Sequence, residues 1–102
     1  MPDAHLRVSR VALPGGADLE LIEYVKPEGK RLGLRTCNAG VAHIAFVVED
    51  ADKLYKDLSG KGVDFVSPPV WAPAAGGGKG RWRVSYFHGP DGITFEMIQK
   101  TE

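Results

Sequence analysis

The sequence contains only one cysteine, Cys37. A single thiol cannot form a disulfide within one chain, and it cannot build a metal site from several thiolates. No neighbouring residue marks Cys37 as an activated nucleophile. This cysteine usage is typical of a reducing compartment, so we expect a cytoplasmic protein.

The sequence also lacks an excess of either charge. Lysine plus arginine and aspartate plus glutamate each number 13, so the formal net charge is zero. A balanced chain exerts no long-range attraction on nucleic acid or on an anionic membrane. No run approaches the roughly 18 apolar residues of a membrane-spanning helix, and the segment MPDAHLRVSR lacks the apolar core of a signal peptide. We therefore expect neither nucleic acid nor a membrane as a partner.

The composition that is present is that of an ordinary globular domain. Hydrophobic residues make up 43% of the sequence and charged residues 25%, which is close to the averages of globular proteins. A domain of this size buries roughly 60–65% of the surface that its unfolded chain exposes. We expect a single domain with a thin margin of stability.

The first part of the sequence predicts a β-hairpin. Residues 5–13 and 19–25 alternate as strands do, and residues 14–18, PGGAD, separate them. Proline presets one turn dihedral and glycine admits positive φ, so a tight turn is expected there. The following residues mix proline, glycine and charge without periodicity, which indicates a linker. The predicted units are a hairpin over residues 1–25, a linker over 26–38 and a second unit over 39–102.

The second unit predicts a strand, a helix and three further strands, which is an α+β pattern. An amphipathic helix is expected after Asp50, because apolar residues recur there at helical spacing. Three prolines between positions 68 and 73 exclude that stretch from a central strand. The apolar helix face consists of Ala51, Leu54, Tyr55 and Leu58, and the strands are residues 40–48, 63–66, 81–88 and 93–99.

His43 is the first candidate for a functional residue. Ile44 and Phe46 share the bulky face of the first strand of this unit, whereas His43 shares the opposite face with small residues such as Ala45. The bulky face should meet the helix, which leaves room for a ligand beside His43. A lone histidine in such a strand is nonetheless more often a hydrogen-bonded core residue than a ligand.

Glu96 changes the interpretation of His43. The last strand places Phe95 and Met97 on its packing face and Glu96 on the other face, within an otherwise apolar run. An ionised carboxylate is costly to bury unless it is paired or binds a metal. Together, His43 and Glu96 on the open faces of the first and last strands form half of a site for a divalent cation.

The predicted hairpin also contains glutamates. Glu20 shares a strand face with Ile22 and Tyr24, whereas Glu23 lies on the other face with Leu21. One of the two glutamates can simply be solvated. The pattern alone does not choose between Glu20 and Glu23.

Three segments carry a resemblance to a known family. GVAHIAFVVED at residues 40–50 and YFHGPDGITFEMIQ at residues 86–99 resemble the opening and the close of a βαβββ module of the vicinal oxygen chelate superfamily, which contains glyoxalases, bleomycin resistance proteins and extradiol dioxygenases. LELIEY at residues 19–24 resembles the last strand of a preceding module. The resemblance implies a βαβββ module with a curved mixed sheet, preceded by a β-hairpin that is the remnant of a first module.

The same resemblance implies a divalent metal held by Glu20, His43 and Glu96. Oxygen and imidazole ligands suit Zn, Ni, Co, Mn or Fe(II). The family's further ligand, typically a histidine or glutamine, lies on a strand that would precede residue 5. Water, substrate or a neighbouring chain would therefore fill the remaining position, and His5 does not match the family pattern.

The implied function is that of a metal-dependent lyase or isomerase similar to glyoxalases or epimerases. Glu96 or Glu20 would move a proton on a small vicinal-oxygen substrate through an enediolate. An extradiol-type dioxygenase is an alternative, but it needs two histidines and one carboxylate, of which only His43 and Glu96 are present. A non-enzymatic ligand-binding protein similar to the bleomycin resistance members is the other alternative, and the halved first module favours it.

Four further residues are candidates for substrate binding. Lys79 and Arg81 flank the glycine-rich loop and could hold a carboxylate or a phosphate. Trp71 and Tyr86 could line a cavity, although large aromatic residues in a small domain more often belong to the core or to a dimer surface. We also expect a homodimer, because a sheet that curls around an open face exposes its edges and an apolar concavity.

Overall fold

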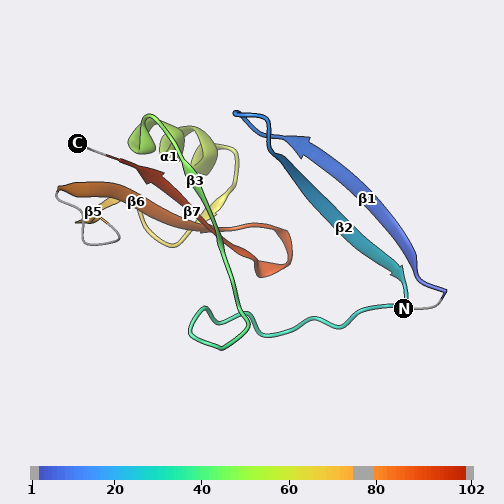
Figure 1. Ribbon diagram of the computed structural model, residues 1–102. Helices are drawn as coiled ribbons and strands as arrows, with labels where there is room; N and C mark the ends of the chain where they lie inside the picture. Colours follow the sequence, from blue (N-terminus) through green and yellow to red (C-terminus); the bar gives the residue numbers. More distant parts are fainter. Residues whose placement is uncertain (1–2, 75–79, 101–102) are drawn as a thin grey trace. The chain divides into compact units, whose positions relative to one another are not determined.

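A computed structural model of the protein describes residues 3–74 and 80–100. The chain divides into two compact units, Met1–Leu32 and Gly33–Glu102, and the division falls within the predicted linker. The elements, labelled in Figure 1, are β1 (His5–Ala12), β2 (Asp18–Lys26), β3 (Ile44–Val47), α1 (Ala51–Gly60), β4 (Asp64–Phe65), β5 (Val70–Pro73), β6 (Arg81–His88), a 3-10 turn (Pro90–Gly92) and β7 (Thr94–Gln99).

The first unit is the predicted antiparallel hairpin of β1 and β2. Gly15 and Gly16 have φ of 91° and 92° at its turn, a conformation that side chains with a Cβ rarely adopt. Arg10 lies opposite Glu20, and their side chains form an ion pair of 3.3 Å. Apolar side chains on both faces of the hairpin remain about half exposed.

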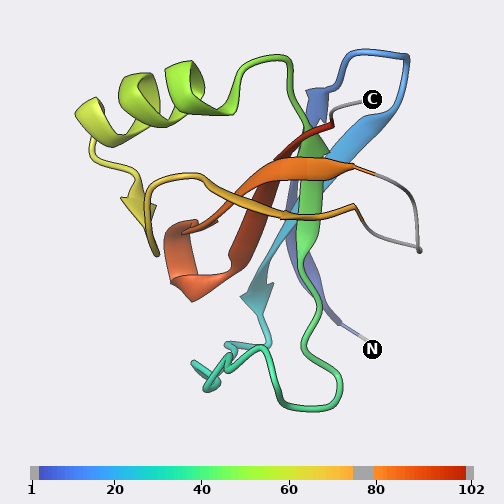
Figure 2. The same ribbon diagram turned by 90° about the vertical axis from the view of Figure 1, so that its left-hand side faces the viewer.

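The second unit contains a mixed sheet with strand order β3-β7-β6-β4, and β5 also pairs with β6. Strand β3 is parallel to β7, whereas β6 is antiparallel to β7, β4 and β5. Helix α1 follows β3 and contacts β6 and β7 (Figure 2). The structure thus confirms the predicted α+β fold with a mixed sheet and a preceding hairpin.

An aromatic row crosses the face of this sheet that meets α1. Each ring contacts the next, and the row begins on the helix and reaches the edge strand β3. Such pairs contribute roughly 0.5–1.5 kcal/mol each beyond the area that they bury. The rings, in order, are Tyr55, Phe65, Phe87, Phe95 and Phe46, with successive centroids 4.9, 5.1, 5.5 and 6.1 Å apart.

Hydrogen bonds fix the start of α1. The Asp50 side chain accepts a hydrogen bond of 3.1 Å from the backbone N–H of Lys53, as expected of an N-cap aspartate. The side chain of Gln99 in β7 accepts a second one, of 2.8 Å, from the backbone N–H of Ala51. The last strand therefore holds the beginning of the helix.

Strands β3 and β5 of the second unit differ most from the prediction. Strand β3 covers only Ile44–Val47, so His43 lies just before the strand and not within it. Strand β5, Val70–Pro73, was not predicted, because the prolines around it masked its short pairing run. It pairs only with β6, so the prolines do keep this stretch from a central position.

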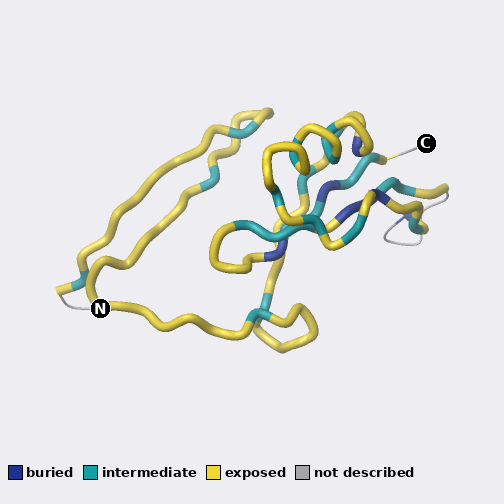
Figure 3. The backbone as a smooth tube through the Cα atoms, turned by 180° about the vertical axis from the view of Figure 1, so that it is seen from behind, coloured by how far each residue is buried: buried dark blue, intermediate teal, exposed yellow. Residues whose placement is uncertain are grey.

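Burial is concentrated in the second unit, where Figure 3 shows the buried positions of the described residues. Met97 and Ser85 are the largest side chains that are almost completely buried, with 1% exposure each. Both lie on the α1 side of the sheet, which agrees with the predicted packing face of β7. No helix in the described part of the chain is long and apolar enough to cross a membrane.

The turn before β7 contains a glycine that the aromatic row requires. A Cβ at Gly89 would overlap the edge of the Phe95 ring. We predict that Gly89→Ala lowers the free energy of unfolding by about 1–3 kcal/mol, as is usual for overpacking. Urea denaturation followed by far-UV circular dichroism would measure the loss.

Two further variants control this prediction. Gly29→Ala places its Cβ in open space, so we expect a change below about 1 kcal/mol. Adding Phe95→Leu to Gly89→Ala should reduce the cost of the alanine, because it removes the ring edge. If Gly89→Ala were as stable as wild type, the close approach to Phe95 would not matter.

Candidate functional site

The sheet brings His43 and Glu96 together on the face opposite the aromatic row. In the parallel pairing of β3 with β7, Ala45 lies opposite Glu96, and His43 precedes that position by two residues. His43 Nε2 lies 3.1 Å from Glu96 Oε1. The Glu96 side chain is only 12% exposed and that of His43 is 39% exposed. The two side chains are therefore in direct contact, and the carboxylate is largely shielded from solvent.

Tyr86 lies beside this pair, so that His43, Glu96 and Tyr86 form a line of three polar side chains. It lies directly opposite Glu96 in the antiparallel pairing of β6 with β7. Its ring meets the His43 ring edge to face, with centroids 5.7 Å apart and an angle of 71°. Burial and then the neighbouring Glu96 carboxylate, through its charge and hydrogen bonding, raise the pKa of the Tyr86 phenol. The phenol thus remains a protonated hydrogen-bond donor at neutral pH.

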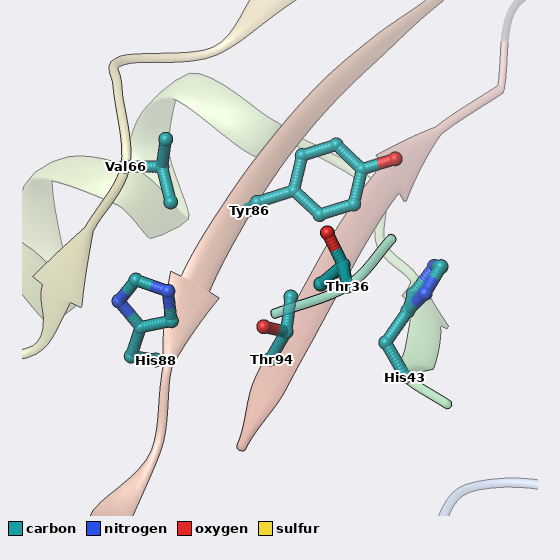
Figure 4. Close-up of a pocket in the computed structure, with 6 residues that line it drawn as sticks. All are labelled: Thr36, His43, Val66, Tyr86, His88 and Thr94. Carbon is teal, nitrogen blue, oxygen red and sulfur yellow. The ribbon is translucent and has the colours of Figure 1, made fainter. Parts of the chain in front are cut away.

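A pocket of about 460 Å³ opens on this face of the sheet. Its volume falls in the range of small-molecule sites. Figure 4 shows that side chains from the two central strands, the segment after β4 and the segment before β3 converge on it. The lining residues are Thr36, His43, Val66, Tyr86, His88 and Thr94.

A second polar pair borders the same pocket. His88 ends β6 and lies opposite Asp64 of β4. His88 Nδ1 is 3.1 Å from Asp64 Oδ2. Because His88 and Tyr86 are two residues apart in one strand, their side chains share the open face.

The other predicted site residues make different contacts. Glu20 belongs to the hairpin, where it pairs with Arg10. Trp71 lies on the α1 side of the sheet, where the Arg83 guanidinium is 5.2 Å from the centre of its ring. Arg81 is the first residue of β6 and lies on the same face of the strand as Arg83. Lys79 lies outside the described residues.

Sequence reasoning missed four of the pocket residues. Thr94 lies on the same face of β7 as Glu96, and His88 lies on the same face of β6 as Tyr86. The strand alternation therefore also places these two residues on the open face. Thr36 lies in the irregular linker, where no periodicity applies, and Val66 follows β4, which ends at Phe65 and not at residue 66 as predicted. These four residues are Thr36, Val66, His88 and Thr94.

The donor set of the open face is compatible with part of a metal site. His43 offers an imidazole nitrogen and Glu96 a carboxylate oxygen in direct contact, and both are common ligands of divalent transition metals. Within residues 3–74 and 80–100, no cluster of three or more His, Cys, Asp or Glu side chains is assembled. The pair fits two positions of a coordination sphere, and further ligands would have to join it.

Comparison with solved structures gives the same fold. A glyoxalase family protein from Bacillus cereus is 20% identical, with a TM-score of 0.75, over 97% of this chain and 64% of that protein. A glyoxylase/bleomycin resistance protein/dioxygenase domain from Frankia is 23% identical, with a TM-score of 0.72, over 99% of this chain and 73% of that one. This chain thus spans less than two thirds of the length of the Bacillus cereus protein.

Comparison of sequences identifies the family. No curated protein matches the chain. The model of the glyoxalase/bleomycin resistance protein/dioxygenase superfamily matches residues 2–97. Because this match spans nearly the whole sequence, the chain belongs to the glyoxalase/bleomycin resistance protein/dioxygenase superfamily.

Proposed function

We propose that the protein is a metal-dependent lyase or isomerase of the glyoxalase or epimerase type, acting on a small substrate with two vicinal oxygens. Members of the superfamily are typically metal-dependent and bind small molecules. The observation that supports the proposal is the contact of 3.1 Å between His43 and Glu96. His43 lines a pocket large enough for a small substrate, and the Glu96 carboxylate beside it offers a second ligand type for a divalent cation.

In this proposal, Glu20, His43 and Glu96 hold the metal. Zn, Ni, Co, Mn or Fe(II) bound there would polarise the two vicinal oxygens of the substrate and acidify the neighbouring C–H bond. Glu20, which pairs with Arg10 in the hairpin, would be the third ligand. His43 and Glu96 are held by the sheet.

The chain's own residues would carry the proton. The Glu96 or Glu20 carboxylate takes it from the substrate carbon and returns it to the neighbouring position. The low exposure of Glu96, 12%, keeps water from competing for this proton. The Tyr86 phenol, which stays protonated, can donate a hydrogen bond to a substrate oxygen on which negative charge develops.

One observation favours a second candidate, a non-enzymatic binding protein. The described residues bring His43 and Glu96 into contact at the open face, but they assemble no cluster of three or more His, Cys, Asp or Glu side chains. A pocket of about 460 Å³ can retain a small molecule without any metal. Metal binding by the purified protein distinguishes the two candidates.

The two hairpin glutamates provide a test of the proposed metal site. Glu20 and Glu23 lie on opposite faces of the hairpin, and each pairs with one arginine. We predict that Glu20→Gln weakens binding of Zn, Ni, Co or Mn at least tenfold, because it removes a charged ligand. Isothermal titration calorimetry would measure the affinity.

Matched variants complete this test. Glu23→Gln makes the same chemical change on the other face, so its metal affinity should equal that of wild type. His43→Ala and Glu96→Gln should weaken binding as much as Glu20→Gln does. If wild-type protein takes up less than about a tenth of an equivalent of metal and shows no thermal shift with any of these ions, the lyase or isomerase proposal fails.

The ionisation of Tyr86 provides a second prediction. Its pKa in the folded protein is raised above the ordinary value of 10.0. The neutral phenol therefore contributes stability that is fully present below pH 10 and is lost as the pH rises through the folded-state pKa. We predict that Tyr86→Phe removes this alkaline loss of stability, as measured by urea denaturation from pH 8 to 11.

A spectroscopic titration identifies the cause of the shift. Phenolate absorbance reports the three tyrosines together, and Tyr86→Phe should remove the component that ionises at the highest pH. Glu96→Gln should lower the pKa of Tyr86 without returning it to the ordinary value, because burial is the larger cause. Tyr24→Phe, in the hairpin, should leave the high-pH component in place.

We also propose that the protein is a homodimer. An isolated two-stranded hairpin is at best marginally stable in water, and Val8 and Leu21, on opposite faces of this hairpin, are 53% and 50% exposed. Val47 and Val66 of the second unit are 65% and 62% exposed. A second copy could cover this apolar surface.

Sedimentation velocity at micromolar concentration tests the dimer. We predict a dimer for wild type and a shift toward monomer for Leu21→Glu, because a charge would enter an apolar interface. Leu32→Glu is the control, since Leu32 is already 73% exposed in the linker. A stable wild-type monomer would contradict the proposal.

A further inference from the structure

The open face carries a second polar row beside the one that contains Glu96. In the register of β6 with β7, Tyr86 lies opposite Glu96, and His88 lies opposite Thr94. The row of His88 continues to Asp64 on β4. Residues two apart in a strand are separated by roughly 6–7 Å, so the two rows are about that far apart along the sheet.

Both rows face the same pocket. His43 and Tyr86 of the first row and His88 and Thr94 of the second row all line it. Figure 4 shows His88 and His43 on either side of Tyr86 and Thr94, with one ring nitrogen of His88 turned toward Tyr86. A molecule that fills this pocket therefore meets His88 as well as His43.

The pair of Asp64 and His88 determines what this imidazole offers. The Asp64 carboxylate can only accept a hydrogen bond, so Nδ1 of His88, 3.1 Å away, carries the hydrogen. In the neutral ring, Nε2 then holds the lone pair. Nε2 is thus an acceptor for an O–H group of a ligand.

We propose that His88, positioned by Asp64, is a second recognition point of the pocket and selects ligands that carry a hydroxyl group remote from their two vicinal oxygens. The inference rests on the proposed function, because it extends the ligand of that site. His88 is a binding residue in this scheme, and Asp64 is a positioning residue.

A purely structural role for the pair makes different predictions. Asp64 is 77% exposed and His88 40%, and pairs between exposed charged groups contribute little to stability. If the pair only joined β4 to β6, replacing either residue would change stability and leave ligand preference unchanged. The preference among ligands therefore discriminates between the two roles, and the tautomer of His88 tests whether Nε2 can accept a hydrogen bond.

The first test measures the tautomer by nitrogen-15 NMR of the full chain, at a pH where the imidazoles are neutral. We expect hydrogen on Nδ1 of His88 in wild type. Asp64→Ala should shift the hydrogen toward Nε2, whereas Asp64→Asn should retain the wild-type tautomer, since its carbonyl oxygen still accepts. A hydrogen on Nε2 of His88 in wild type would overturn the proposal.

The second test compares two probes that differ by one hydroxyl group, 4-methylcatechol and 4-(hydroxymethyl)catechol. NMR titration of the zinc-loaded protein should give about fivefold tighter binding of the hydroxylated probe, as expected for one neutral hydrogen bond. His88→Phe should reduce this preference to below about twofold and leave the affinity for 4-methylcatechol nearly unchanged.

His5→Phe is the matched control, because His5 begins the hairpin strand β1 and does not line the pocket. It should keep the fivefold preference. If neither catechol binds wild type in the presence of zinc, the vicinal-oxygen function fails and the role of His88 fails with it, whereas equal preference in wild type and in His88→Phe overturns the role of His88 alone.

Discussion

The row of aromatic rings from Tyr55 to Phe46 is the contact on which the arrangement of the open face depends. Side chains alternate strictly along a strand. Because Phe87 and Phe95 project toward α1, Tyr86 and Glu96 must project from the other face of the sheet. A shift of one residue in either strand would exchange the polar and aromatic faces and would be opposed by the burial of the whole row.

This packing determines the positions of the polar side chains. Glu96 lies on β7, which pairs with β3 on one side and with β6 on the other. Its carboxylate therefore meets His43, which immediately precedes β3, on one side and Tyr86 of β6 on the other. The chemistry proposed for the pocket depends on this central placement, because a carboxylate on an edge strand would be open to water on one side.

Much of this arrangement follows from sequence patterns. The alternation around His43 and Glu96 predicted their common face, and the helical spacing after Asp50 predicted α1. Other features depend on strand register, which local patterns do not contain. The contact of Asp64 with His88 joins strands separated by the glycine-rich loop, and Trp71 meets Arg83 only because β5 pairs with β6. Thr36 reaches the pocket through the path of an irregular segment.

The order of strands in the sheet also bears on how the second unit forms. Strand β7 is the last strand in the sequence, yet it lies between β3 and β6, and its Gln99 holds the start of α1. Neither the parallel pairing of β3 with β7 nor the complete aromatic row can form until β7 has left the ribosome. The sheet of this unit is therefore governed by contacts distant in sequence, and such contacts slow folding.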